Sequence, residues 1–339
     1  MANSKRESRL AGKHYLVTGG TGFIGAALVK ALLAAGARVR AFDNNSRGSG
    51  ERLGREARKV ELILGDIRDS DALTKAMRGV DAVCHLAYIN GTEFFYTKPE
   101  AVLEVAVKGM MNVIDACIAH KVPELALFSS SEVYHAPAKV PTDETAPLIV
   151  PDVLNPRYSY GGGKIISELL ALNFGRKNLQ RVVILRPHNV YGPDMGWEHV
   201  IPQITLRMRK LPKGNKRATP FEIQGSGKET RAFIYIDDAI GGALSVLEQG
   251  KHLGLYHIGN DHEITIEQLA RQIARCLSVH IKIVPGELRP GSPPRRCPDI
   301  SKLRALGFEP RTTLQDGLAR TVQWYDENAH RKRPSANDR

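Results

Sequence analysis

The chain has 339 residues, a formal net charge of +12, 42% hydrophobic residues and 25% charged residues. This composition is ordinary for a globular protein and excludes a chain that is disordered over most of its length. No apolar run reaches the roughly 20 residues that a membrane-spanning helix needs, and the first residues lead into no apolar signal segment, so we expect a cytoplasmic protein with no membrane partner.

The positive charge is compatible with nucleic acid or with an anionic small molecule as partner. Lysine and arginine are spread along the chain, and the two densest runs, at 207–217 and 331–333, contain no interleaved aromatic residue. A nucleic-acid partner is therefore disfavoured. The four cysteines are scattered without the spacing of a zinc site, so we expect free thiols and no bound metal.

The first part of the chain predicts a strand, a glycine-rich turn and a helix. An apolar run ends at Val17, glycines follow as Gly19, Gly22 and Gly25, and small or apolar residues continue at helical density to Gly36. In this context the glycine spacing indicates a dinucleotide-binding turn, because glycines let the backbone approach a pyrophosphate at a helix N-terminus. A glycine turn without a ligand is the alternative, and the agreement of strand, spacing and helix disfavours it.

The next predicted strand ends in Asp43, about twenty positions after the glycines, where an adenine ribose needs a carboxylate. Asp43 can accept hydrogen bonds from the ribose hydroxyls and would repel a 2'-phosphate, so NAD is favoured over NADP as the cofactor. Arg47 nearby weakens this preference, and a simple turn residue is the alternative for Asp43.

Further strands are predicted at 60–67, 81–87, 125–129 and 181–186, with helices after 69, over 99–120 and over about 158–174. Strands and helices alternate without hairpin signals. This pattern predicts an α/β fold with a Rossmann-like, doubly wound parallel sheet.

Beyond residue 190, prolines interrupt the regular alternation, although helices are still expected near 200–209, 236–248, 264–277 and 314–325. We therefore expect an NAD-binding domain of residues 1–190 plus about 231–260. A smaller, irregular C-terminal lobe for the substrate would comprise 191–230 plus 261–327, followed by a basic tail at 328–339.

Tyr160 and Lys164 are spaced four residues apart on a predicted helix, which puts the phenol and the ammonium on one face. A neighbouring ammonium and a cationic nicotinamide both favour phenolate, so Tyr160 could take a hydroxyl proton while hydride leaves carbon. Lys164 would also hold the nicotinamide ribose. The three glycines between them are costly in a helix and indicate the close approach of substrate or another helix. A surface tyrosine and lysine are the alternative.

A second candidate cluster leaves the end of the strand at 125–129. Ser130 carries a hydroxyl that can hydrogen-bond a reacting oxygen, and Glu132 places a carboxylate in the same short turn. A serine-rich turn with a solvated glutamate is the alternative.

Taken together, these motifs resemble the extended short-chain dehydrogenase/reductases, in particular the NAD-dependent nucleotide-sugar epimerases and dehydratases. The resemblance runs from Val17 to about Tyr325. It is carried by TGGTGFIG at 18–25, Asp43-Asn44, Gly65-Asp66-Ile67, His85-Leu86-Ala87, Ser-Glu-Val-Tyr at 131–134, Tyr160 with Lys164, LRPHNVYGP at 185–193, RAFIYIDD at 231–238 and Arg295-Arg296.

The resemblance implies roles for individual residues. Cofactor contacts are implied at Gly19, Gly22, Phe23, Ile24, Gly25, Asp43, Asn44, Asp66, Ile67, Leu86, Ala87, Tyr160, Lys164 and Pro187. The implied catalytic set is Ser130, Glu132, Tyr160 and Lys164. Substrate contacts are implied at Ser130, Asn189, Val200, Arg231 and Arg295, with Arg296 as the alternative to Arg295. A homodimer that pairs the helices starting near 99 and 158 is also implied.

The pair Ser131-Glu132 resembles the Thr-Ser-Glu of GDP-mannose 4,6-dehydratase and of uronate decarboxylases. Because a ketone at C4 acidifies the C5 proton, a glutamate beside it could start an elimination. We therefore expect modification of a nucleotide-diphosphate sugar through a transient 4-keto intermediate, with dehydration ahead of 4-epimerisation and uronate decarboxylation. Dehydration would need an acid other than Ser131.

Two further points qualify this expectation. Ala106 stands where the family usually has an asparagine, so one hydrogen bond near the cofactor is expected to be missing. The alternative of another class is a non-catalytic protein that binds NAD or a nucleotide, which the relay set Ser130, Tyr160 and Lys164 disfavours.

Overall fold

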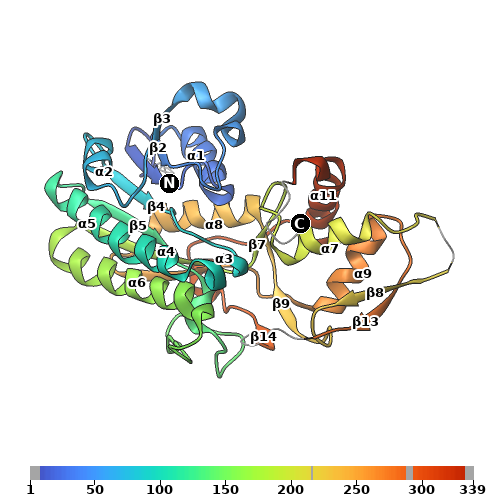
Figure 1. The fold of residues 1–339 in the computed structure, drawn as a ribbon. Coiled ribbons are helices and arrows are strands. Elements are labelled where there is room, and N and C mark those ends of the chain that lie inside the picture. Colours follow the sequence, from blue (N-terminus) through green and yellow to red (C-terminus); the bar gives the residue numbers. More distant parts are fainter. Residues whose placement is uncertain (1–7, 215–216, 288–292, 333–339) are drawn as a thin grey trace, which may run out of the picture.

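The computed structural model describes residues 8–214, 217–287 and 293–332 (Figure 1). Seven parallel strands form the central sheet in the order β11-β6-β5-β4-β1-β2-β3. They are β1 (His14–Thr18), β2 (Arg38–Asp43), β3 (Val60–Leu64), β4 (Ala82–His85), β5 (Glu124–Phe128), β6 (Arg181–Pro187) and β11 (Gly254–Ile258). The order reverses at β1, which confirms the predicted doubly wound Rossmann-like sheet.

Helices cover both faces of the sheet because successive residues of each strand point to opposite sides. Val17 and Ala126 belong to the hydrophobic core shared with α1 (Phe23–Ala34) and α8 (Ile236–Gln249). Their neighbours Leu16 and Leu125 belong to a second core, shared with α2 (Ser70–Ala76), α5 (Met110–Ala119) and α6 (Ser159–Asn178). The strands are therefore buried on both sides, as parallel strands usually are.

The helix predicted over 99–120 contains a π turn. It consists of α4 (Pro99–Glu104), a π segment at Val105–Gly109 and then α5. At Gly109 an added Cβ would lie 2.3 Å from Cδ1 of Ile67, so only glycine lets this helix pack against the loop after β3. The backbone oxygen of Ala106 accepts a hydrogen bond of 3.1 Å from Ser167 on α6.

The remaining elements are smaller. Several of them, including α7, α9 and β8, form the irregular C-terminal lobe (Figure 1). The helices are α3 (Thr92–Thr97), α7 (Val200–Met208), α9 (Ile266–Cys276), α10 (Ser301–Arg304) and α11 (Leu314–Glu327). Short 3-10 helices lie at Gly50–Lys59, Ser131–Tyr134, Pro156–Tyr158 and Ala329–Arg331. The strand pairs are β7 (Val190–Tyr191) with β10 (Ile234–Tyr235) and β8 (Thr219–Ile223) with β13 (Ile281–Pro285). A third sheet places β9 (Thr230–Ala232) between β12 (Glu263–Thr265) and β14 (Arg295–Arg296).

Parts of both chain ends lie outside the described residues. Residues 333–339, most of the basic tail expected at 328–339, lie outside the described residues. Within the described ranges, no helix combines the length and the hydropathy that crossing a membrane requires.

Candidate active site

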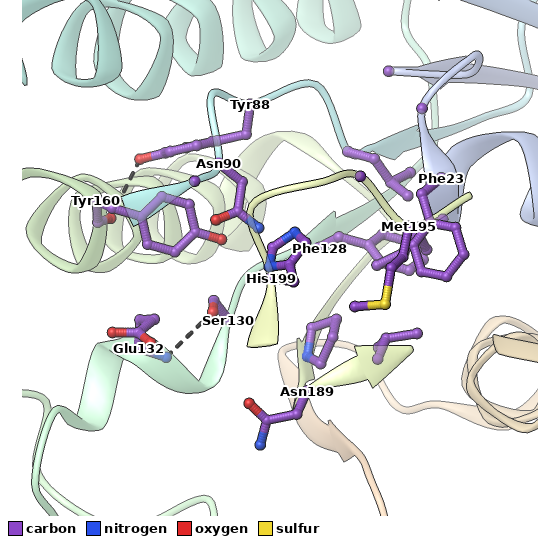
Figure 2. A pocket seen from close by; sticks show the side chains of 18 of the residues that line it. Phe23, Tyr88, Asn90, Phe128, Ser130, Glu132, Tyr160, Asn189, Met195 and His199 are labelled. Carbon is purple, nitrogen blue, oxygen red and sulfur yellow. Dashed lines mark hydrogen bonds between the residues drawn. The ribbon is translucent and has the colours of Figure 1, made fainter. Parts of the chain in front are cut away.

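A pocket of about 370 Å³ opens where the predicted site residues meet (Figure 2), and this size is typical of small-molecule sites. The parallel strands β1, β4, β5 and β6 all end at this edge of the sheet. The predicted residues in the lining are Gly19, Gly22, Phe23, Ile24, Gly25, Leu86, Ser130, Glu132, Tyr160, Lys164, Pro187, Asn189 and Val200. The fold thus brings the glycine turn and the predicted relay residues into one cavity.

The glycine turn has the geometry of an anion-binding loop. Gly19 has a φ of +72°, and an added Cβ there would lie 2.7 Å from the Ala87 nitrogen. A Cβ on Gly25 would lie 2.0 Å from the Gly19 oxygen. Helix α1 begins at Phe23, and Gly22 before it has no side chain to cap the first N–H groups. These free N–H groups line the pocket and suit a pyrophosphate.

The predicted cofactor-contacting residues Asp43, Asn44 and Asp66 adjoin the glycine turn but do not line the pocket. Ile67 and Ala87, also predicted to contact the cofactor, do not line it either. The Asp43 carboxylate accepts hydrogen bonds from the backbone nitrogens of Thr21 at 3.0 Å and Asn45 at 2.9 Å. Asn44 donates to the Asp66 carboxylate at 3.0 Å. The pKa of Asp66 is lowered to about 2, chiefly by its hydrogen bond with Arg68, so this carboxylate is ionised at neutral pH and paired with the Arg68 guanidinium.

Tyr160 lies in the first turn of α6 with 6% of its surface exposed. Its ring stacks on Phe95, with centroids 4.8 Å apart, and meets the edge of Tyr88 at 5.1 Å. Burial raises the pKa of the Tyr160 phenol to about 12, against the opposing effect of a hydrogen bond with Ser130. The phenol is therefore protonated at neutral pH in this arrangement.

Lys164 is 3% exposed and donates a hydrogen bond of 2.7 Å to the Phe128 oxygen at the end of β5. Burial lowers the pKa of its ammonium to about 7. The lysine is thus poised to change its protonation state near neutral pH, one helical turn from Tyr160.

The glycines between Tyr160 and Lys164 have different surroundings. An added Cβ on Gly163 would lie 2.4 Å from the Tyr88 hydroxyl and 2.8 Å from the Ala106 Cβ, whereas one on Gly162 would meet its nearest neighbour at 3.5 Å. An added Cβ on Gly161 would have the Glu132 backbone oxygen as its nearest atom, at 3.0 Å. The close approach expected of this glycine run is therefore made by Tyr88 and Ala106 at Gly163.

Two arginines hold the carboxylate of Glu132. Arg157 donates to one carboxylate oxygen at 3.1 Å and Arg296 to the other at 2.5 Å. Burial alone would raise the pKa of Glu132, but the charges and hydrogen bonds of Arg296 and Arg157 outweigh it and lower the pKa to about 2. Such a carboxylate stays ionised and is a weak base.

The expectation for Arg295 needs correction, because the structure places Arg296 in the pocket instead. Alternate residues of a strand point to opposite sides, so only one of the pair can face the cavity. The Arg295 side chain is 53% exposed and pairs with Glu263 at 2.6 Å. Arg231 does not line the pocket either. Its guanidinium donates to the backbone oxygens of Thr230 and Pro293, at 2.7 and 2.9 Å.

A model of the NAD dependent epimerase/dehydratase family matches residues 15–259. The chain belongs to this family. The UDP-N-acetyl-alpha-D-glucosaminuronate decarboxylase of Bacillus cytotoxicus is 29% identical over an alignment of 325 residues, and the match covers 93% of this chain and 98% of that protein.

Solved structures of the family agree with the fold. A UDP-glucose 4-epimerase of Thermotoga maritima, solved with UDP-glucose, has a TM-score of 0.82 at 26% identity and covers 93% of this chain and 99% of its own. A dTDP-glucose 4,6-dehydratase of Streptomyces venezuelae, solved with NAD, has a TM-score of 0.82 at 29% identity and covers 94% of this chain and 98% of its own. This epimerase/dehydratase family member is therefore an enzyme with NAD as its cofactor.

Sequence reasoning missed several lining residues of this epimerase/dehydratase family member: Arg47, Tyr88, Asn90, Phe95, Met195 and His199. Tyr88 directly follows the predicted strand that ends in His85-Leu86-Ala87, and His199 directly precedes α7, so a search of residues flanking the motifs would have found both. Arg47 pairs with Glu198 at 3.4 Å and lies over the Phe94 ring at 5.2 Å. These contacts give it a place in the pocket wall that residue spacing does not predict.

Proposed function

We propose that the protein oxidises C4 of a nucleotide-diphosphate hexuronic acid transiently and decarboxylates the resulting 4-keto sugar. The observation that carries this proposal is the Glu132 carboxylate held between Arg157 and Arg296 beside Ser130 and Tyr160. The glycine turn at Gly19, Gly22 and Gly25 would hold NAD, which would supply reversible hydride transfer at C4.

Side chains of this protein would transfer the proton of the C4 hydroxyl. Tyr160 takes the proton of the C4 hydroxyl, and Ser130 hydrogen-bonds both the phenol and the developing ketone oxygen. The buried phenol needs help to ionise, because its pKa is raised to about 12. The Lys164 ammonium and the cationic nicotinamide are the two charges that favour phenolate.

The state of Glu132 supports decarboxylation over the dehydration favoured by the sequence. Dehydration needs a base for the C5 proton, and a carboxylate with a pKa of about 2 and two arginine partners is a poor base. Loss of carbon dioxide from a 4-keto uronate needs no base. The C5–C6 bond breaks, its electron pair moves to the C4 oxygen as an enolate, and a solvent proton then reaches C5.

Arg296 supports a substrate that carries a carboxylate. Its side chain is 7% exposed, and within the described residues its buried Nε and Nη2 atoms have no hydrogen-bond partner. Unpaired buried N–H groups are costly unless a ligand satisfies them, and guanidinium suits a carboxylate. The B. cytotoxicus relative is a decarboxylase of a nucleotide-linked uronate.

A panel of UDP-, GDP-, dTDP- and CDP-linked hexoses and hexuronates, each incubated with enzyme and NAD and followed by mass spectrometry, tests the proposal. We expect a product lighter by the mass of carbon dioxide from one nucleotide hexuronate. A product lighter by the mass of water would establish dehydration, the runner-up supported by the Ser131-Glu132 pair. An isomer of unchanged mass, detected by NMR, would establish 4-epimerisation.

We further propose that residues 191–230 and 261–327 form the nucleotide-sugar-binding lobe. Val200 on α7 and Arg296 on β14 support it, since both extend into the pocket from that part of the chain. Asn189 lines the pocket at the junction, where its amide donates to the Ala232 oxygen at 2.8 Å.

A homodimer through α4, α5 and α6 is also proposed. Helix α6 packs beside the continuous run of α4 and α5 (Figure 1). These helices expose the large apolar side chains Leu103, Ile118, Ile166, Leu169 and Phe174, which are between 37% and 55% accessible. Exposed large apolar side chains on adjoining helices favour burial against a second copy.

A further inference from the structure

The buried ammonium of Lys164 lies against the face of Tyr88. Its Nζ is 3.8 Å from the centroid of the Tyr88 ring, compared with 5.9 Å from the centroid of Tyr160. The aromatic face nearest the relay lysine therefore belongs to a residue outside the catalytic set. A cation that close to a ring face, and desolvated, is attracted by the ring quadrupole.

Other groups around Lys164 give its charge little support. Glu168, one turn further along α6, attracts the ammonium, but both of its carboxylate oxygens accept hydrogen bonds from Arg186 at 2.9 and 2.6 Å. His85 on β4 is neutral, because burial and then the Lys164 charge lower its pKa to about 3. The phenols of Tyr88 and Tyr160 are also neutral, since burial raises the pKa of each.

An ammonium has three N–H donors, and among the described residues Lys164 makes one hydrogen bond, to the Phe128 backbone oxygen. The Tyr88 ring is thus the main group near the ammonium that can replace the water removed by burial.

Residues of α6 leave the space into which Tyr88 packs. The Tyr88 hydroxyl lies 2.4 Å from where a Cβ of residue 163 would be, so Gly163 leaves the space that this hydroxyl occupies. The hydroxyl is also 3.5 Å from the Tyr160 backbone oxygen. One helix therefore holds Tyr160, Lys164 and the gap for Tyr88.

We propose that Tyr88 is a positioning residue whose ring face keeps the Lys164 ammonium protonated and in place beside Tyr160. This inference rests on the proposed function of Lys164 in the proton relay. Removing the ring face should destabilise the ammonium, so Lys164 should lose its proton at lower pH. From the strength of a desolvated cation–π contact, we expect a shift of about one pH unit.

Competitive acylation with acetic anhydride measures this directly, because only the neutral amine reacts. The full-length enzyme is labelled over a range of pH without substrate, and peptide mass spectrometry gives the pH midpoint for Lys164. Tyr88→Phe keeps the ring face and should leave the midpoint within a few tenths of a pH unit. Tyr88→Leu should lower it by about one unit.

Two further variants keep the test decisive if Tyr88→Leu fails to fold. Pentafluorophenylalanine at position 88 has nearly the shape of phenylalanine but a reversed quadrupole, so it should lower the midpoint at least as much as leucine. Phe95→Leu removes the ring that stacks on Tyr160. Among the described residues the Phe95 ring makes no cation–π contact with Lys164, so this variant should leave the midpoint unchanged.

An unshifted midpoint with pentafluorophenylalanine, or an equal shift with phenylalanine, would overturn the proposal. In variants that turn over, the alkaline limb of the kcat profile should move to lower pH with the labelling midpoint. Since labelling needs no substrate, failure of the nucleotide-uronate panel leaves this readout intact, and the two proposals fail separately.

Discussion

Arg295 and Arg296 are adjacent on β14, yet their side chains have opposite surroundings. Arg296 lines the pocket and donates to Glu132, whereas Arg295 lies at the surface against Glu263. We predict that Arg296→Met lowers kcat/KM at least 100-fold, because a buried charge-assisted contact to the substrate is lost. Arg295→Met, the matched control, should stay within about threefold of wild type, as exposed ion pairs contribute little. Steady-state kinetics on the substrate found in the panel compares them, and equal losses would contradict this assignment.

Glu132 also predicts a pH dependence of stability. Its folded pKa of about 2 lies below the value of about 4.3 for an unfolded glutamate, so its ionisation stabilises the fold fully above pH 5. This contribution is lost as pH falls from about 4 towards 2. Glu132→Gln should therefore lower the free energy of unfolding at pH 7 by on the order of 2 kcal/mol.

The pH effect itself is measured by urea unfolding of wild type and Glu132→Gln at pH 7 and pH 3. Because glutamine does not titrate, the difference between the two proteins should shrink at pH 3. A difference that is the same at both pH values would show that the Arg157 and Arg296 contacts do not depress the pKa of this carboxyl.

At the scale of elements, α6 holds two glycines that should respond oppositely to alanine. Gly162→Ala meets only an ordinary contact at 3.5 Å and should raise the free energy of unfolding by about 0.5–1 kcal/mol through helix propensity. Gly163→Ala places a Cβ 2.4 Å from the Tyr88 hydroxyl and should be destabilising by about 1–3 kcal/mol. Thermal and urea unfolding report both changes. A stabilising Gly163→Ala would mean that Tyr88 is not seated against this helix.

At the scale of the whole molecule, the exposed apolar face of α4, α5 and α6 predicts a dimer. Leu169→Glu, at a position 55% exposed on α6, should shift the protein to monomer because a charge would be buried in the interface. Leu64 on β3 is 71% exposed at the far edge of the sheet, so Leu64→Glu is the control and should leave the mass unchanged. Light scattering coupled to size-exclusion chromatography distinguishes the two. A monomeric wild type would contradict the interface.

The sequence by itself determined six of the seven strands of the sheet, the glycine turn and the relay pair, because each depends on short-range patterns. The edge strand β11 was not predicted. Alternating apolar runs define strands, glycine spacing defines the turn, and four-residue spacing places Tyr160 and Lys164 on one helix face. The identity of the cofactor followed from the same local signals.

Only the tertiary structure decided the charge states of the site residues and the side chains that they contact, since both depend on contacts between distant segments. The choice of Arg296 over Arg295 depends on which side of β14 faces the pocket, and Glu132 meets an arginine 164 positions away. Tyr88 meets Lys164 only because the segment that follows β4 lies beside the first turns of α6. Burial shifts the pKa values of Tyr160 and Lys164, and two arginines from distant segments lower that of Glu132 against the effect of burial. Both effects are properties of the packed fold, and no local pattern encodes them.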